Sequence, residues 1–164
     1  MTTPKAKFAG LALIAALCAG FTLGLTAPAW AGFDEGVAAY KRGDYATALR
    51  EWRPLAKQGN AIAQSNLGFM YGKGLGVTQD YAEAVKWFRK AAEQGDTGGQ
   101  YNLGGMYYNG HGVPQDYVQA HMWYNLVASQ DGKAAAKLRD MVAERMTPAQ
   151  ISEAQKLARE WRPR

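Results

Sequence analysis

The sequence predicts an all-α fold built from tandem helix pairs, and three observations support this prediction. Residues 59–94 and 95–130 are identical at 17 of 36 positions when they are aligned without a gap. Within each copy, apolar residues recur at the spacing of a helix that packs against a core. An aspartate also stands at an expected helix start in each copy. A fixed period of this length is typical of repeat architectures, in which one helical unit stacks on the next.

The N-terminal segment has the layout of a secretory signal peptide. Two lysines precede the uncharged stretch 8–25, and the small-x-small sequence 29–31 follows it. A basic start, an apolar centre and an Ala-x-Ala end are the three parts of such a signal. We therefore predict a signal peptide at 1–31, cleavage after Ala31, and a periplasmic or secreted protein. The alternative is a retained membrane anchor, because 18 uncharged residues can just span a bilayer.

Cleavage would change the composition of the protein. The full chain has 164 residues, a net charge of +5, 19 glycines and one cysteine. Without residues 1–31 it would have 133 residues, no cysteine and a charge of +3, from 17 basic and 14 acidic side chains. Its stability would then come from packing rather than from disulfides. The basic residues are spread among acidic ones, which argues against a nucleic-acid partner.

A shorter unit at 32–58 precedes the two long copies. The tripeptide Asp-Tyr-Ala at 44–46 recurs at 80–82, again at an offset of 36. The first half of this unit is four residues shorter, since Gly36 and Gly68 lie 32 apart while Gly68 and Gly104 lie 36 apart. We place the deletion in the glycine-rich loop of the long copies.

Each unit is predicted to hold two antiparallel helices. Asp44, Asp80 and Asp116 occupy the N-cap position of the second helix, and Glu83 and Gln119 follow two of them with the spacing of a capping box. Such a cap stabilises a helix by about 1 kcal/mol, which explains the repeated aspartate without any catalytic role.

Glycines inside the predicted first helices indicate close helix contact. Gly68 and Gly104 share one repeat position, although glycine costs about 1 kcal/mol relative to alanine in a helix interior. We therefore expect the neighbouring helix to fit against them. The core positions of the second long helix are Tyr81, Ala84, Val85 and Phe88, and those of the helix before it are Leu67, Gly68 and Tyr71.

The glycine-rich sequence 72–76 is predicted to be a turn and not a phosphate-binding loop. It lacks the glycine–lysine spacing, the following Ser or Thr, and the preceding strand that such a loop needs. The second copy keeps the glycines at 110 and 112 and loses the lysine. Glycines that need positive φ explain this pattern.

These motifs resemble a known family. Asn-Leu-Gly-x-Met-Tyr followed by Gly-x-Gly-Val-x-Gln-Asp-Tyr-x-x-Ala-x-x-Trp is similar to the Sel-one-like repeat (SLR), a relative of the tetratricopeptide repeat (TPR), over 59–94 and 95–130. Residues 32–58 resemble a shorter, TPR-length unit. The resemblance implies an α/α solenoid, a right-handed superhelix of stacked helix pairs. It also implies an adaptor or scaffold role in protein complexes.

Residues 131–164 depart from the repeat. The stretch 133–145 is predicted to be the first helix of a partial unit without the glycine loop. Thr147, Pro148 and Gln150 then form a strong helix start, with Thr as N-cap and Pro at the first position. Because terminal repeats of a solenoid must close the stack, we predict that 148–161 is a C-terminal capping helix.

The sequence offers no catalytic, metal or cofactor site. His111 lies in a glycine loop, and His121 takes the helix position that Val85 has in the previous copy, without a second ligand at metal spacing. The serines lie in ordinary helical surroundings, without a nearby base. One tryptophan and one tyrosine recur in each repeat and are predicted to be core residues: Trp52, Trp87, Trp123, Tyr45, Tyr81 and Tyr117.

Binding is expected at positions that differ between copies. In TPR-like stacks the first helix of each pair lines a concave groove. Asn66 and Asn102 resemble asparagines that hold a peptide backbone in some TPR domains; alternatively, they tie neighbouring helices together. The candidate groove residues are Asn66, Phe69, Lys73, Tyr101, Asn102, Tyr108 and Asn109.

The sequence thus favours an exported adaptor that binds protein or peptide segments in this groove. It predicts no cofactor, no nucleic acid and no membrane contact once the signal is cleaved. A monomer is expected, or weak self-association through an exposed end of the stack. Two alternatives stay open: a periplasmic enzyme or enzyme accessory that acts on cell-wall material, and a protein that binds a small ligand in the groove.

Overall fold

The computed structural model describes residues 29–130 and 132–164, and within these ranges every regular element is a helix. In chain order the helices are α1 (Ala29–Lys41), α2 (Tyr45–Lys57), α3 (Ala61–Lys73), α4 (Tyr81–Glu93), α5 (Thr97–Asn109), α6 (Tyr117–Ala128), α7 (Lys133–Ala143) and α8 (Pro148–Glu160). The predicted signal peptide, 1–31, lies almost entirely outside the described residues. Its expected cleavage point follows Ala31, in the first turn of α1.

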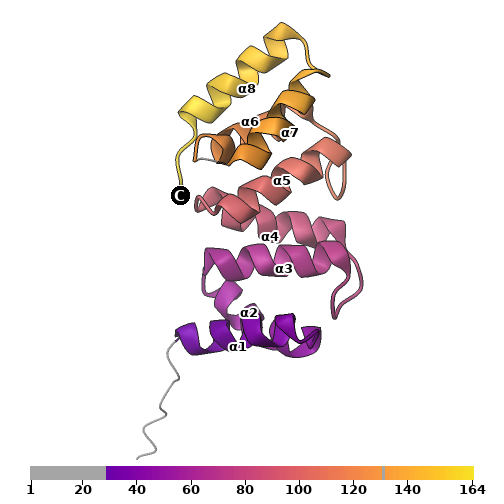
Figure 1. Cartoon of the computed structure of the whole chain (residues 1–164), viewed down its shortest axis with the longest axis vertical. Helices are drawn as coiled ribbons and strands as arrows, with labels where there is room; N and C mark the ends of the chain where they lie inside the picture. The colour runs from indigo at the N-terminus through magenta and orange to yellow at the C-terminus, as the bar shows by residue number, and fades with distance from the viewer. Residues whose placement is uncertain (1–28, 131) are drawn as a thin grey trace, which may run out of the picture.

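Each helix from α1 to α6 packs against the helix that follows it in the chain. Figure 1 shows the resulting stack, with α1 at one end and α8 at the other. We refer to α1–α2, α3–α4 and α5–α6 as units 1, 2 and 3. The first helices of units 2 and 3, α3 and α5, also contact each other. The predicted all-α solenoid of helix pairs is therefore confirmed.

The repeated aspartates cap the second helix of each unit, as predicted. The carboxylate Oδ1 accepts from a backbone N–H three residues on, at 3.1 Å for Asp44, 2.9 Å for Asp80 and 3.0 Å for Asp116. Glu83, which could complete a capping box on α4, instead forms an ion pair of 2.9 Å with Lys86. α8 has the complete capping box that its sequence predicts.

One glycine of the first helix faces one aromatic ring of the second helix in every unit. A Cβ added at Gly68 would lie 2.6 Å from a ring carbon of Phe88, and one at Gly104 would lie 2.9 Å from a ring carbon of Tyr124. These distances are too short for any side chain, so the predicted close helix contact is confirmed. The three pairs are Gly36 with Trp52, Gly68 with Phe88, and Gly104 with Tyr124.

The tryptophan predicted for the core does not occupy the same repeat position in every unit. Trp52 shares its repeat position with Phe88 and Tyr124, not with Trp87 and Trp123. Burial differs as well, because Trp52 and Trp123 are buried while Trp87 is only half-buried. The tyrosines expected in the core, Tyr45, Tyr81 and Tyr117, are also half-buried.

The glycine loops are turns, as predicted. Gly74, Gly76, Gly110 and Gly112 have φ values between 68° and 71°, a left-handed conformation that disfavours other residues. A glutamine closes each loop: Gln79 Nε2 donates to the carbonyl of the first glycine, Gly72, at 2.8 Å. The equivalent bond runs from Gln115 to the Tyr108 carbonyl at 2.7 Å.

Polar side chains join each unit to the next at repeated positions. Gln64 Nε2 donates to the Ala56 carbonyl at 3.0 Å, and the equivalent Gln100 reaches the Ala92 carbonyl at 3.4 Å. Arg89 of α4 also donates to the Tyr107 hydroxyl of α5 at 3.0 Å. These bonds add polar contacts to the apolar packing between neighbouring units.

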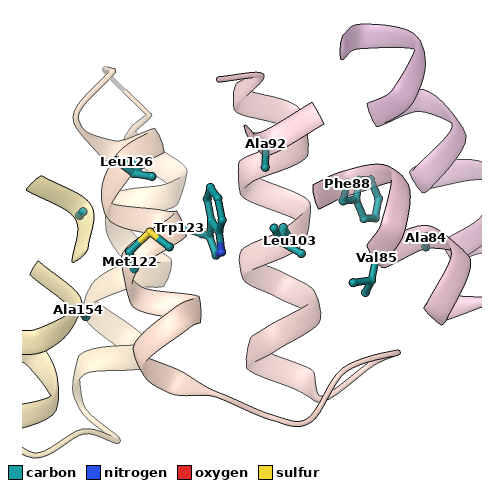
Figure 2. Packing of buried hydrophobic residues seen from close by; sticks show 10 residues of the cluster. Ala84, Val85, Phe88, Ala92, Leu103, Met122, Trp123, Leu126 and Ala154 are labelled. Carbon is teal, nitrogen blue, oxygen red and sulfur yellow. The ribbon is translucent and has the colours of Figure 1, made fainter. Parts of the chain in front are cut away.

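The core runs through the stack instead of forming one central cluster. Figure 2 shows Trp123 of α6 pointing toward Leu103 of α5, with Phe88 of α4 beyond it. Ala154 and Ala158 of α8 pack on the same cluster. The Trp161 ring lies 6.2 Å from the Trp123 ring, and the backbone N–H of Arg164 donates to the Glu93 carbonyl at 2.8 Å. α8 and the tail thus cover the apolar end of unit 3.

His121 is a buried polar side chain at the contact between α6 and α7. Its side chain is 3 % exposed, more buried than the partly buried position that the sequence predicts, and its Nδ1 has no hydrogen-bond partner. Burial lowers the pKa of His121 below the ordinary value of 6.5, and nearby Arg139 lowers it further. The imidazole is therefore neutral in the folded protein at neutral pH.

We predict that stability falls as the pH is lowered because of His121. In the unfolded chain the imidazole takes up a proton near its ordinary pKa of 6.5, while in the folded chain it does so only at lower pH. The stability is fully present above pH 6.5 and is lost as the pH falls through the folded-state pKa. Thermal melts between pH 8 and pH 5 will show this decline, and His121→Val, which places the residue of the preceding unit there, will flatten it. His111→Asn, a change at the exposed histidine, is expected to keep the wild-type profile; a decline unchanged in His121→Val would contradict the assignment.

Candidate functional site

A hollow lies between α3 and α5, the first helices of units 2 and 3. We call it the central pocket; its volume is about 310 Å³. One wall is α3 and the other is α5, while Phe88 of α4 lies at its base and Tyr81 and His111 close one end. Its lining residues are Phe69, Gly72, Lys73, Gln79, Tyr81, Phe88, Tyr101, Asn102, Gly105, Met106, Asn109 and His111.

A second hollow lies between α1 and α3. We call it the N-terminal pocket; its volume is also about 310 Å³, and it is lined by Val37, Tyr40, Lys41, Trp52, Asn66 and Phe69. Phe69 lines both pockets. The two hollows therefore adjoin along the first helices of units 1 to 3, and together we call them the groove.

Six of the seven candidate residues from the sequence line the groove. Asn66 lies in the N-terminal pocket, Phe69 in both pockets, and four more in the central pocket: Lys73, Tyr101, Asn102 and Asn109. Tyr108 lies elsewhere. Its ring packs 5.8 Å from the ring of Tyr117, beneath the guanidinium of Arg145 at 5.4 Å.

The asparagines of α5 are held within their own helix. Asn102 Nδ2 donates to the Gly98 carbonyl at 2.8 Å, and Asn109 Nδ2 donates to the Gly105 carbonyl at 2.9 Å. These bonds do not tie α5 to a neighbouring helix. They fix the direction of each amide and leave its oxygen and its second N–H for other partners.

The groove combines aromatic and amide side chains with two lysines. Among the described residues, the linings of both pockets include two formally charged side chains, Lys41 and Lys73, and no carboxylate. The two lysines share a repeat position in the last turn of α1 and α3. Lys73 Nζ lies 5.9 Å from the centre of the Phe69 ring, so a positive charge stands beside an apolar surface.

The sequence analysis missed the closed end of the central pocket. Tyr81 and His111 stack there with ring centres 4.5 Å apart, and Gln79 Nε2 donates to the Tyr81 hydroxyl at 3.1 Å. These residues come from loops and from the start of a second helix, whereas the groove residues expected from the sequence all lie on first helices. Lys41, which the sequence analysis did not name, could have been found from the repeat. It stands 32 residues before Lys73, the same spacing as between Gly36 and Gly68.

The described part of the chain holds no cluster of three side chains that could bind a metal ion. Within the same ranges, no helix combines the length and the apolar character that a membrane span needs. What the groove offers chemically is aromatic surface, amide groups and lysine charge, which are means of binding.

Comparison with known proteins identifies the repeats. The Sel1 repeat model matches residues 61–96 and 98–132, which include the helices of units 2 and 3. The chain contains two Sel1 repeats. Sel1 repeats generally form non-catalytic scaffolds that mediate interactions between proteins.

Solved structures show the same fold. A protective antigen present in uropathogenic Escherichia coli strains, which displays an SLR fold, matches with a TM-score of 0.78 and 32 % identity over 82 % of this chain. A Sel1 repeat protein from Oxalobacter formigenes matches with a TM-score of 0.63 and 30 % identity over 77 % of this chain. The alignments span 30 % and 54 % of those two chains. A search of curated proteins found no significant match.

Two glycines of the groove are not required by the packing of the Sel1 repeats. A Cβ at Gly105 would meet only the Tyr124 hydroxyl, at 3.4 Å. One at Gly72 would meet Met106 Cε at 3.4 Å and Ala84 Cβ at 3.6 Å, which are ordinary contacts. Both glycines lie within helices and have room for a Cβ.

We predict opposite stability effects for two glycine substitutions within the Sel1 repeats. Gly105→Ala will raise the free energy of unfolding by about 0.5–1 kcal/mol, because alanine favours the helix and its Cβ fits. Gly68→Ala will lower it by about 1–3 kcal/mol, because the Cβ collides with Phe88. Urea unfolding followed by circular dichroism will measure both changes. Equal effects of the two substitutions would show that the local packing described here is wrong.

Proposed function

We propose that this protein, which contains two Sel1 repeats, is an exported adaptor that binds an extended segment of a partner protein in the groove. The observation that carries the proposal is that Phe69 lines both pockets, so that a linear ligand can contact α1, α3 and α5 at once. Because the scaffold is a stack of helices, an extended chain laid across their first helices meets variable residues from each unit. Aromatic side chains and asparagine amides suit the side chains and the backbone of such a segment.

The dimensions of the groove favour a peptide over one small molecule. Each pocket has a volume of about 310 Å³, near the lower end of the usual range for ligand sites, about 300–1,000 Å³. A peptide can place one side chain in each pocket and cover Phe69 between them. A compact ligand would use only one of the two.

The lining also favours binding over hydrolysis. Among the described residues, neither pocket includes a serine, threonine, cysteine or carboxylate. Acyl transfer and glycoside hydrolysis depend on such groups. The adaptor is therefore favoured over an enzyme that acts on cell-wall material.

Export is supported by the layout of residues 1–31 and is compatible with the packing of α1. The residues of α1 that belong to the first core cluster are Phe33, Val37, Ala39 and Tyr40. The Trp52 indole nitrogen also donates to the Phe33 carbonyl at 3.3 Å. Cleavage after Ala31 would leave all of these contacts in the mature protein.

We predict that the purified protein selects binding peptides from a displayed library of random twelve-residue sequences. Phe69→Ala will weaken the selected peptides at least tenfold in fluorescence polarisation, because Phe69 contributes to both pockets. Ile62→Ala is the matched control: Ile62 lies on the same helix, is 55 % exposed and lies outside both pockets. Affinity that stays unchanged in Phe69→Ala while the helical spectrum is retained would count against the groove.

We also predict export and cleavage. Expressed with its own N-terminus in a Gram-negative bacterium, the protein will be recovered from the periplasm, and intact-mass analysis will give a chain that starts at Gly32. Substitution of Ala31 by a bulky residue is expected to block cleavage, because signal peptidase requires small residues there. A full-length chain in the membrane fraction would instead support the retained anchor.

A further inference from the structure

We propose that the central pocket receives an aromatic side chain of the partner segment, next to an acidic residue that pairs with Lys73. This inference rests on the proposed function and names the chemistry of the segment. Gly72 and Gly105 are then the residues that determine specificity, because they leave the space that the aromatic ring would fill.

The evidence starts from a tyrosine pair that unit 2 lacks. In unit 1, Tyr40 packs against Tyr45 with ring centres 5.6 Å apart. In unit 3, the equivalent rings of Tyr108 and Tyr117 lie 5.8 Å apart. The second ring is present in unit 2 as Tyr81, but its intramolecular partner is replaced by Gly72.

The missing ring leaves Tyr81 at the end of an open space. Tyr81 lines the central pocket, and its ring stacks on His111 at 4.5 Å. The pocket walls nearby are Phe69 and Phe88. An aromatic side chain from a partner would contact the rings of Tyr81, Phe69 and Phe88 there. In units 1 and 3, the rings of Tyr40 and Tyr108 belong to the same part of the unit.

The second glycine enlarges the same space. Gly105 takes the repeat position that unit 2 fills with Phe69 and unit 1 with Val37. Both Gly72 and Gly105 have room for a Cβ, unlike Gly68 and its equivalents. Glycine inside a helix reduces stability, and here no close contact between helices compensates for it. Two glycines on opposite walls of one pocket are explained if the pocket has to accept a large group.

The charge of the pocket lining indicates which kind of residue stands next to the aromatic residue in the partner segment. Among the described residues, Lys73 is the one formally charged side chain that lines the central pocket, and Lys41 is the one that lines the N-terminal pocket. A partner segment with basic residues would be repelled at both places. An acidic residue beside the aromatic ring would meet Lys73, which adds a charge-assisted contact that weakens with salt.

Peptide selection followed by variants of the pocket tests the proposal. The wild-type protein is expected to enrich peptides in which Trp, Tyr or Phe adjoins Asp or Glu. For the most enriched peptide, made synthetically with a fluorescent label, Gly72→Tyr and Gly105→Phe are each expected to weaken binding at least tenfold, because they fill the pocket with the residue of another unit. Ala149→Phe, which adds the same ring at an exposed position of α8, is the control and is expected to bind as the wild type does.

Charge is tested with the same peptide. Lys73→Gln is expected to weaken binding three- to tenfold at low salt and to remove most of its salt dependence. Replacement of the aromatic residue of the peptide by alanine is expected to abolish binding to the wild type.

The possible failures can be told apart. If peptides are enriched but carry no aromatic–acidic pair, or bind equally to folded Gly72→Tyr and Gly105→Phe, the proposal for the pocket is wrong while the adaptor function stands. If the wild-type protein enriches no peptide, both are wrong. Two variants that fill the pocket are used so that the test does not depend on the folding of a single variant. Circular dichroism shows which of them retains the fold.

Discussion

The contact between a glycine and an aromatic ring inside each helix pair is the constraint on which this structure depends. Gly36, Gly68 and Gly104 allow the second helix to approach so closely that Trp52, Phe88 and Tyr124 lie where a Cβ would otherwise be. Glycine costs each first helix about 1 kcal/mol, while a buried aromatic ring removes about 150–250 Å² from water. The burial outweighs the cost, and the same local geometry recurs in three consecutive units.

Apolar packing and polar bonds both join one pair to the next, because the core clusters extend across neighbouring units. Gln64 and Gln100 bond to the end of the helix before them, and Arg89 bonds across to Tyr107. These bonds repeat with the chain period, so α1, α3 and α5 present equivalent positions along one surface. The repeated residues build the scaffold, and the residues that differ between units line the groove.

The central pocket shows how a repeat protein can acquire a site without new elements. Units 1 and 3 carry a pair of tyrosines where unit 2 has Gly72 and Tyr81, and unit 3 has Gly105 where unit 2 has Phe69. Loss of two side chains on facing helices opens a space in an otherwise regular stack. The helix backbone does not need to move, because its position is held by the glycine–aromatic contacts and by the capped helix starts.

The sequence by itself determined the helices, their caps, the turns and the stacked arrangement, because each of these depends on local chemistry repeated at a constant spacing. Asp80 caps α4 whatever surrounds it, and Gly74 needs positive φ in any such loop. The resemblance to TPR-like stacks also led to the prediction that Phe69, Lys73 and Tyr101 line a groove. Only the tertiary structure decided that Tyr108 packs on Tyr117 instead, that Tyr81 and His111 close the pocket, and that Gly72 and Gly105 are glycines without a packing need. These facts depend on distances between helices in the folded chain, and the spacing of residues along the sequence does not contain them.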